Sequence, residues 1–148
     1  MAELVSKPSE KSVAETMDAL EAAVNGAGAT VFARVEHAAG AAAVDLEMPE
    51  AQLLIFGNPR LGTPVMNMDI VAGLQLPLRV LVHETADGSV SVSYETAETL
   101  LDGLSVDMNA EVIGRMNGAL NMLTDKAIAE SRARPCLPHC GRWRYDSA

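Results

Sequence analysis

The chain has 148 residues, of which 49% are hydrophobic, 21% are charged and only 3% are aromatic. This composition predicts one soluble domain with a core of aliphatic and methionine side chains, and it excludes a platform of stacked rings for nucleic-acid bases. The formal net charge of −9 repels phosphate backbones, so we expect no nucleic-acid partner.

The charges are unevenly distributed along the chain. Residues 1–131 carry 19 acidic and 7 basic side chains, whereas residues 132–148 carry 1 acidic and 4 basic side chains. We therefore expect a single α+β domain over residues 1–131 and an appended basic, flexible tail over residues 132–148. Both cysteines lie in the tail, and the sequence shows neither a stretch of about 18 apolar residues nor a signal-peptide core. We expect a cytoplasmic protein without a membrane partner.

The first part of the chain predicts alternating strands and helices. A weak strand at Ala2–Val5 is followed by a helix that begins at a capping box, in which Ser12 and Glu15 satisfy free backbone N–H groups. Alternating side chains predict a strand over Thr30–His37, and an alanine-rich stretch predicts a short helix over Ala38–Leu46.

The middle of the chain contains the densest set of signals. The apolar stretch Gln52–Phe56 predicts a central strand that is covered on both faces, and the loop GNPRLGTP follows it. Thr63 is expected to cap the next helix, with Pro64 at the first helical position, where a missing N–H has no cost.

A hairpin is predicted next. Asp87-Gly88 lies between the strands Leu78–Thr85 and Ser89–Tyr94, and this dipeptide favours a two-residue loop, which would pair Leu81 with Tyr94. A short helix or an irregular connection over Thr96–Leu104 and a long amphipathic helix that opens at Asn109 complete the domain.

These elements predict an α+β fold in which two main helices cover one face of an antiparallel sheet of four to five strands. Two helices can cover only one face of such a sheet, yet Gln52–Phe56 is apolar on both faces. We therefore expect a homodimer, in which a second copy covers the other face.

The segments TVFARVEHAAGA, LLIFGNPRLGTPVM and LPLRVLVHE, followed by the Asp87-Gly88 turn and a closing SYE, resemble the bacterial domain-of-unknown-function family 302. The resemblance covers roughly Val5 to Lys126. It implies a TATA-binding-protein-like fold with a curved sheet and pairing as a homodimer, and no settled activity. The positions that match the family's motif are His37, Gly57, Asn58, Pro59, Gly62, Thr63 and Pro64.

The GNPRLGTP loop offers a candidate ligand site. Asn58, Arg60, Gly62 and Thr63 would present an amide, a cation and helix N-terminal N–H groups to one spot, which is an arrangement that binds a small anionic ligand. The alternative is a tight strand-to-helix turn with a solvated arginine.

His37 and Glu47 offer a candidate acid–base pair beside the same loop. The alternative role for His37 is that of a structural hydrogen-bonding group at the end of a strand. We expect no cofactor, because phosphate-loop, dinucleotide-binding and nucleophile-elbow motifs are absent from the sequence.

Cys136, His139 and Cys140 in the tail have side chains that suit zinc or copper, but three ligands do not close a structural site and their spacing matches no strong zinc pattern. We therefore predict no metal site, and incidental thiols are the favoured interpretation. Five of the eight methionines are expected to fill the core rather than to form a metal site or a recognition surface, namely Met66, Met68, Met108, Met116 and Met122.

Two functions from different classes remain after these steps. The first is a non-enzymatic homodimeric module that binds a small ligand at the GNPRLGTP loop or another protein. The second is a small acid–base enzyme that uses His37, Glu47 and Arg60 beside that loop. A cavity with convergent polar groups would favour the enzyme, whereas a solidly packed turn would favour the module.

Overall fold

The computed structural model describes residues 3–129. The strands are β1 (Leu4–Ser9), β2 (Thr30–Glu36), β3 (Ala51–Gly57), β4 (Leu78–Glu84) and β5 (Val90–Glu95). The helices are α1 (Val13–Gly26), α2 (His37–Ala42), α3 (Pro59–Met68), the 3₁₀ helix η1 (Ile70–Leu74), α4 (Ala97–Leu100) and α5 (Glu111–Ile128). The expected tail and its cysteines lie outside the described residues.

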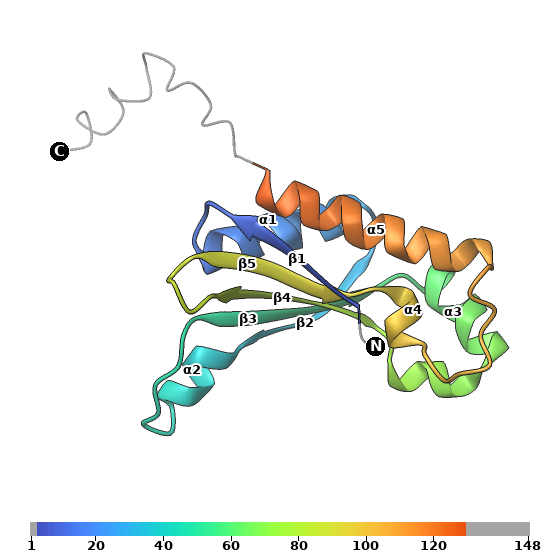
Figure 1. Ribbon diagram of the computed structural model, residues 1–148, viewed down its shortest axis with the longest axis horizontal. Helices are drawn as coiled ribbons and strands as arrows, with labels where there is room; N and C mark the ends of the chain where they lie inside the picture. The colour runs from blue at the N-terminus through green and yellow to red at the C-terminus, as the bar shows by residue number, and fades with distance from the viewer. Residues whose placement is uncertain (1–2, 130–148) are drawn as a thin grey trace, which may run out of the picture.

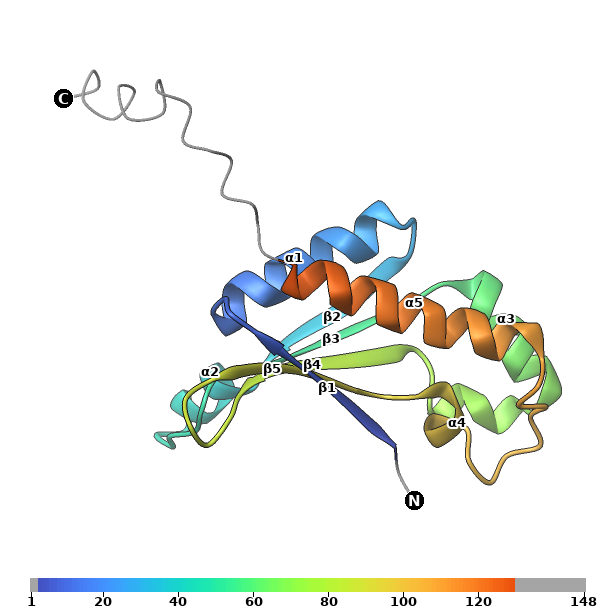
Figure 2. The ribbon, with the colours of Figure 1, turned by 45° about the horizontal axis from the view of Figure 1, so that its top comes forward.

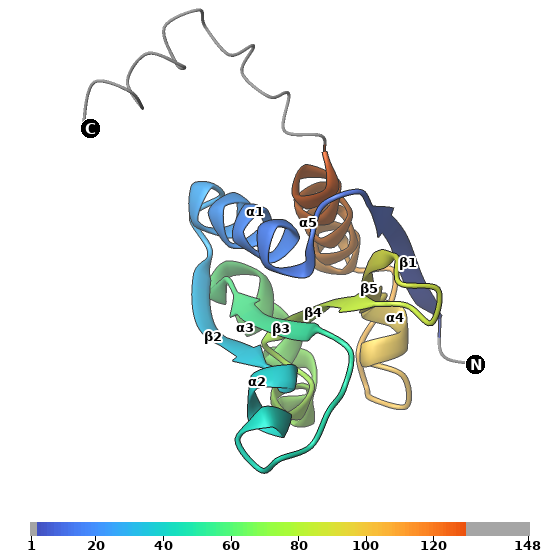
Figure 3. The same cartoon turned by 90° about the vertical axis from the view of Figure 1, so that its left-hand side faces the viewer.

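The strands form one antiparallel sheet in the order β1-β5-β4-β3-β2. Helices α1 and α5 lie side by side on one face of this sheet, whereas α2 lies toward the opposite side (Figure 1, Figure 3). The predicted α+β fold with two main helices on one face is therefore confirmed. The central strand is β4 rather than β3, because β3 lies next to the edge strand β2.

The core lies between the sheet and the two long helices. Its buried side chains come from α1, α5 and the three middle strands, and they include Met17, Leu20, Leu54, Phe56, Val80, Val82 and Leu120. A second cluster joins α3, α4 and α5 beyond the end of the sheet (Figure 2), and it includes Val65, Ala97, Leu101, Ile113 and Met116. Within residues 3–129, no helix is long and apolar enough to cross a membrane.

The hairpin between β4 and β5 differs from the prediction by one residue. Val82 pairs with Val92, and Leu81 pairs with Ser93 instead of Tyr94. The loop between the strands has three residues. The Gly88 N–H donates to the Thr85 carbonyl and closes a turn, and Gly88 then adopts a positive φ of 84°, which is the usual geometry of a three-residue hairpin loop. A shift of one residue moves every side chain of a strand to the other face.

Three further elements correct the sequence prediction. β1 runs through Pro8, which an edge strand tolerates because proline lacks only a donor that faces away from the sheet. α3 begins at Pro59 with Asn58 as its N-cap, and not at Thr63. Burial alternates along β3, so that Leu54 and Phe56 are buried beneath the helices whereas Leu53 remains partly exposed. Within the described chain, only one face of the sheet is covered by helices along its length.

Candidate functional site

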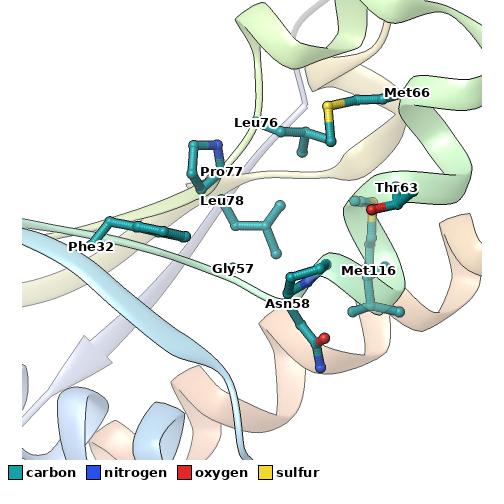
Figure 4. A pocket seen from close by; sticks show the side chains of 12 residues that line it. Phe32, Gly57, Asn58, Thr63, Met66, Leu76, Pro77, Leu78 and Met116 are labelled. Atoms are coloured by element: carbon teal, nitrogen blue, oxygen red, sulfur yellow. The ribbon is translucent and has the colours of Figure 1, made fainter.

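A pocket lies where β3 ends and α3 begins, and we call it the ligand pocket (Figure 4). Its volume is about 220 Å³. One side is formed by the N-cap and first turns of α3, namely Asn58, Pro59, Leu61, Gly62, Thr63 and Met66. The other side is formed by β2, the end of β3, the segment that enters β4, and α5, namely Phe32, Gly57, Leu76, Pro77, Leu78 and Met116.

The pocket is almost wholly apolar. Apart from Asn58 and Thr63, its lining residues are glycines or carry side chains made of carbon and sulfur. Figure 4 shows Phe32 and Leu78 extending toward the same space from the sheet, with Met116 reaching it from α5. Phe32 is 58% exposed, so its ring lies at the border between the pocket and solvent.

The start of α3 positions the polar part of the pocket. The Asn58 side-chain oxygen accepts a hydrogen bond from the Arg60 N–H at 3.0 Å. The N–H groups of Leu61 and Gly62 both donate to the Asn58 carbonyl, at 2.9 and 3.0 Å. Pro59 has no N–H, so the donors of the first turn are already engaged within the chain.

The six predicted ligand-binding residues do not converge on one point. Asn58, Gly62 and Thr63 line the ligand pocket. Arg60 is exposed and is not part of the pocket lining. The structure therefore brings together three of the predicted residues and leaves the predicted cation outside.

His37 and Glu47 lie at the opposite end of the sheet, and both are exposed. Glu36 pairs with Gln52 at one end of the β2–β3 ladder, whereas Thr30 pairs with Gly57 at the other. At about 3.3 Å per residue, a strand of this length spans about 20 Å. The structure therefore does not bring these two side chains to Arg60 or to the GNPRLGTP segment.

Several lining residues were not predicted as site residues. Met66 and Met116 were assigned to the core, and Met116 is indeed buried while it also contacts the pocket. Phe32 and Pro77 come from β2 and from the segment before β4, and no local pattern connects them with Asn58. The glycine and proline content of the segment from Gly57 onward was the only signal near this site.

Comparison with known proteins gives a consistent picture of the fold. A crystal structure of an uncharacterized conserved protein DUF302 from Bacillus stearothermophilus is similar to 84% of this chain and 97% of that protein, with a TM-score of 0.72 and 18% identity. This likeness shows the fold and no more.

Three curated relatives are similar in sequence. A protein of Brucella suis named "Fluoride-specific ion channel FluC 1" is 38% identical over 109 residues, which are 74% of this chain and 43% of that protein. A Brucella melitensis protein named "Fluoride-specific ion channel FluC 2" is also 38% identical, over 74% of this chain and 40% of that protein. This chain thus spans about two fifths of the length of these relatives.

The family model described as "Domain of unknown function DUF302" matches residues 5–123. The match covers most of the sheet, α1 and the greater part of α5, and it includes the segments that form the ligand pocket. The chain therefore belongs to the DUF302 family.

Proposed function

We propose that this protein is a homodimeric module that binds a small molecule in the ligand pocket and does not act as an enzyme there. The observation that carries the proposal is the pocket itself, with a volume of about 220 Å³ and nearly continuous apolar walls. Protein interiors are normally close-packed, and apolar walls left against water forgo the stabilisation that burial supplies. A small ligand would restore that burial.

The acid–base alternative has less support from the geometry. A general acid or base must lie within hydrogen-bond reach of the reacting atom. Among the described residues, none of those that line the ligand pocket is ionisable, and His37 and Glu47 lie at the far end of the β2–β3 ladder. We therefore assign binding rather than proton transfer to this pocket.

The names of the Brucella relatives do not decide the function. They describe proteins of which this chain covers only 40–43%. We do not extend fluoride conduction to this chain, and the proposal is confined to the shared region, in which the family description assigns no activity.

The dimer is supported by the face of the sheet opposite α1 and α5, which we call the open face. One row across it runs from Val35 through Leu53 and Leu81 to Ser93 and Ser6. The apolar half of this row is partly exposed, with Val35 at 37%. A second copy of the chain would bury these side chains by using the same surface twice.

Three polar side chains of the open face, Ser6, Ser93 and His83, are already hydrogen-bonded. Ser6 Oγ lies 2.9 Å from Ser93 Oγ, which lies 2.8 Å from His83 Nε2. The other ring nitrogen of His83 lies 3.1 Å from the Glu84 carbonyl. Because these groups satisfy one another, covering them with a partner would leave few polar atoms without a bond.

Mass spectrometry of ligands retained through native purification tests the binding proposal. Gly62→Leu places a side chain where an added Cβ would lie 3.6 Å from Met66 Cε and 3.8 Å from Leu76 Cδ1, at the edge of the pocket. Gly114→Leu is the matched control, because an added Cβ on that α5 glycine meets nothing within 4 Å. The wild type and Gly114→Leu should retain the same molecule, and Gly62→Leu should lose it. Equal retention by all three proteins would refute the assignment to this pocket.

A further inference from the structure

We infer that the ligand pocket selects an uncharged, flat and largely apolar molecule with one hydrogen-bonding oxygen. The inference rests on the proposed binding function and adds the chemical class of the ligand. Three features of the pocket carry it: the absence of charge in the walls, the Phe32 and Pro77 rings packed against Gly57, and the two polar side chains Asn58 and Thr63.

The uncharged walls of the pocket exclude ionic ligands. Within the described residues, the lining contains neither a cation nor a carboxylate. A charged group that entered these apolar walls would lose its water without gaining a counter-charge. The first-turn N–H groups of α3 are engaged with Asn58, so they do not supply the anion site that this helix start would otherwise offer. A cage for a cation needs several aromatic faces, whereas among the described lining residues Phe32 supplies a single ring.

Two glycines form part of the pocket wall. A Cβ at Gly57 would lie 3.3 Å from Pro77 Cβ and 3.5 Å from Phe32 Cε2, so these two rings already occupy the space beside Gly57. At Gly62 an added Cβ would lie at ordinary contact distances, 3.6 Å from Met66 Cε and 3.8 Å from Leu76 Cδ1. The rings of Pro77 and Phe32 give this wall flat surfaces, and such surfaces favour a flat ligand that stacks or packs edge-on.

The two polar side chains of the lining set the hydrogen-bonding group of the ligand. Asn58 Oδ1 already accepts the Arg60 N–H, so its amide nitrogen is the atom that remains to donate. The Thr63 hydroxyl can donate or accept. A hydroxyl or carbonyl oxygen on the ligand can therefore bond to either side chain.

Methionine methyl groups provide a site-specific readout. Met66 and Met116 line the pocket, and their flexible, polarisable side chains adapt to an aromatic ligand. Met17 belongs to α1 and is buried in the core, and Met48 is exposed beyond α2, so both report on changes elsewhere in the molecule.

The test uses the full chain labelled with ¹³C at the methionine methyl groups and titrated with three probes of one ring system. The probes are neutral 2-naphthol, anionic 2-naphthoate and cationic 2-naphthylmethylammonium. We expect 2-naphthol to shift the Met66 and Met116 signals saturably while Met17 and Met48 stay in place. The two charged probes should bind at least tenfold more weakly. Gly62→Leu should abolish the response, and Gly114→Leu should preserve it.

The outcomes distinguish a failure of this inference from a failure of the proposed binding function on which it rests. If a charged probe moves Met66 and Met116 as strongly as 2-naphthol does, the selection for an uncharged ligand is wrong but binding in the pocket stands. If no probe moves either methyl group, the flat apolar class is wrong, and retention of a natural ligand by native mass spectrometry still decides whether the pocket binds at all.

Discussion

Gly57 and Pro77 lie so close together at the wall of the ligand pocket that a Cβ at position 57 would stand 3.3 Å from Pro77 Cβ. The same atom would lie 3.5 Å from the Phe32 ring. The need for glycine here arises from neighbours that come from β2 and from the segment before β4. Because Pro77 is held at the entry to β4, it has little freedom to withdraw.

Gly57→Ala should therefore destabilise the fold. Overpacking of this kind costs roughly 1–3 kcal/mol in the free energy of unfolding, to be measured by urea denaturation. The control is Gly114→Ala in α5, where the added Cβ meets nothing within 4 Å. That change should raise stability by about 0.5–1 kcal/mol, because alanine favours a helix over glycine. Equal effects of the two substitutions would contradict the steric explanation.

Arg34 and Gln52 form a second pair on which stability should depend. Arg34 Nε donates to Gln52 Oε1 at 2.8 Å, and Gln52 is only 4% exposed. Arg34→Leu would leave that buried oxygen without its donor, at a cost of about 1–3 kcal/mol in urea denaturation. The double variant Arg34→Leu/Gln52→Leu should recover part of the loss, since it removes both partners.

The ion pairs of Arg34 should matter less. Its Nη1 contacts Asp18 at 2.7 Å and Glu21 at 3.1 Å, but these carboxylates are 69% and 37% exposed. Burial alone would lower the pKa of Arg34, but the hydrogen bonds that Arg34 donates to Asp18 and Glu21, together with their negative charges, outweigh it, so that the pKa is raised. Asp18→Ala should cost no more than about 1 kcal/mol, as exposed pairs do. A larger loss in Asp18→Ala than in Arg34→Leu would disprove this ranking.

Asp69 should make stability depend on acid pH. Its carboxylate accepts N–H groups from Ser105 at 2.9 Å and from Val71 at 3.0 Å, and these bonds lower its pKa. In the unfolded chain the carboxylate of Asp69 takes up a proton at about pH 3.9, which is above its pKa in the folded protein. The contribution of Asp69 to stability is therefore complete above that pH and falls as the pH drops further. Asp69→Asn should be less stable than the wild type at pH 7.

Thermal unfolding of Asp69→Asn and the wild type between pH 7 and pH 2.5 measures this dependence. The difference in melting temperature should be constant at neutral pH and should shrink below about pH 4. Asp102→Asn, at an exposed carboxylate three residues before Ser105, is the control. A difference for Asp69→Asn that persists unchanged at pH 2.5 would show that charge is not the cause.

Local signals in the sequence predicted the two long helices well. Ser12 Oγ accepts the Glu15 N–H at 3.1 Å, which is the serine half of the predicted capping box, and α1 begins at Val13. The apolar stripe of the long helix is buried as expected, at Ile113, Met116, Leu120, Leu123 and Ala127. Both features depend on residues three or four positions apart, which share one helical face.

Two sequence signals were each compatible with two structures, and in both cases we predicted the wrong one. Asp87-Gly88 suits both a two-residue and a three-residue loop, and only the pairing of Val82 with Val92 shows which one forms. Asn58-Pro59 and Thr63-Pro64 both have a capping residue before a proline, and the helix uses the earlier pair. The pocket escaped prediction for another reason, because Phe32, Pro77 and Met116 meet only through the tertiary fold.

Removal of the expected tail should leave the domain folded. Both core clusters and the residues packed against them lie within residues 5–128. A chain that ends at Glu130 should therefore melt at nearly the temperature of the full chain in differential scanning calorimetry. A fall of more than several degrees would place the domain boundary further along the sequence than residue 131.

The dimer prediction turns on Val35. This side chain is 37% exposed on the open face, beside Leu53 in the β2–β3 ladder. Val35→Glu would introduce a carboxylate in each copy of the interface, where it would be buried without a partner and would face apolar surface. Because Val35 is already partly in contact with solvent in the single chain, the substitution should weaken association far more than folding.

Size exclusion with light scattering at low micromolar concentration measures the association. The wild type should show a mass near twice 15.6 kDa, and Val35→Glu should show a mass near 15.6 kDa with an unchanged circular-dichroism spectrum. Met122→Glu is the matched control, since Met122 is 44% exposed on α5, on the helical side of the sheet, and should leave the dimer intact. A wild type of 15.6 kDa would refute the dimer, and a dimer lost in Met122→Glu but kept in Val35→Glu would move the interface from the open face to the helices.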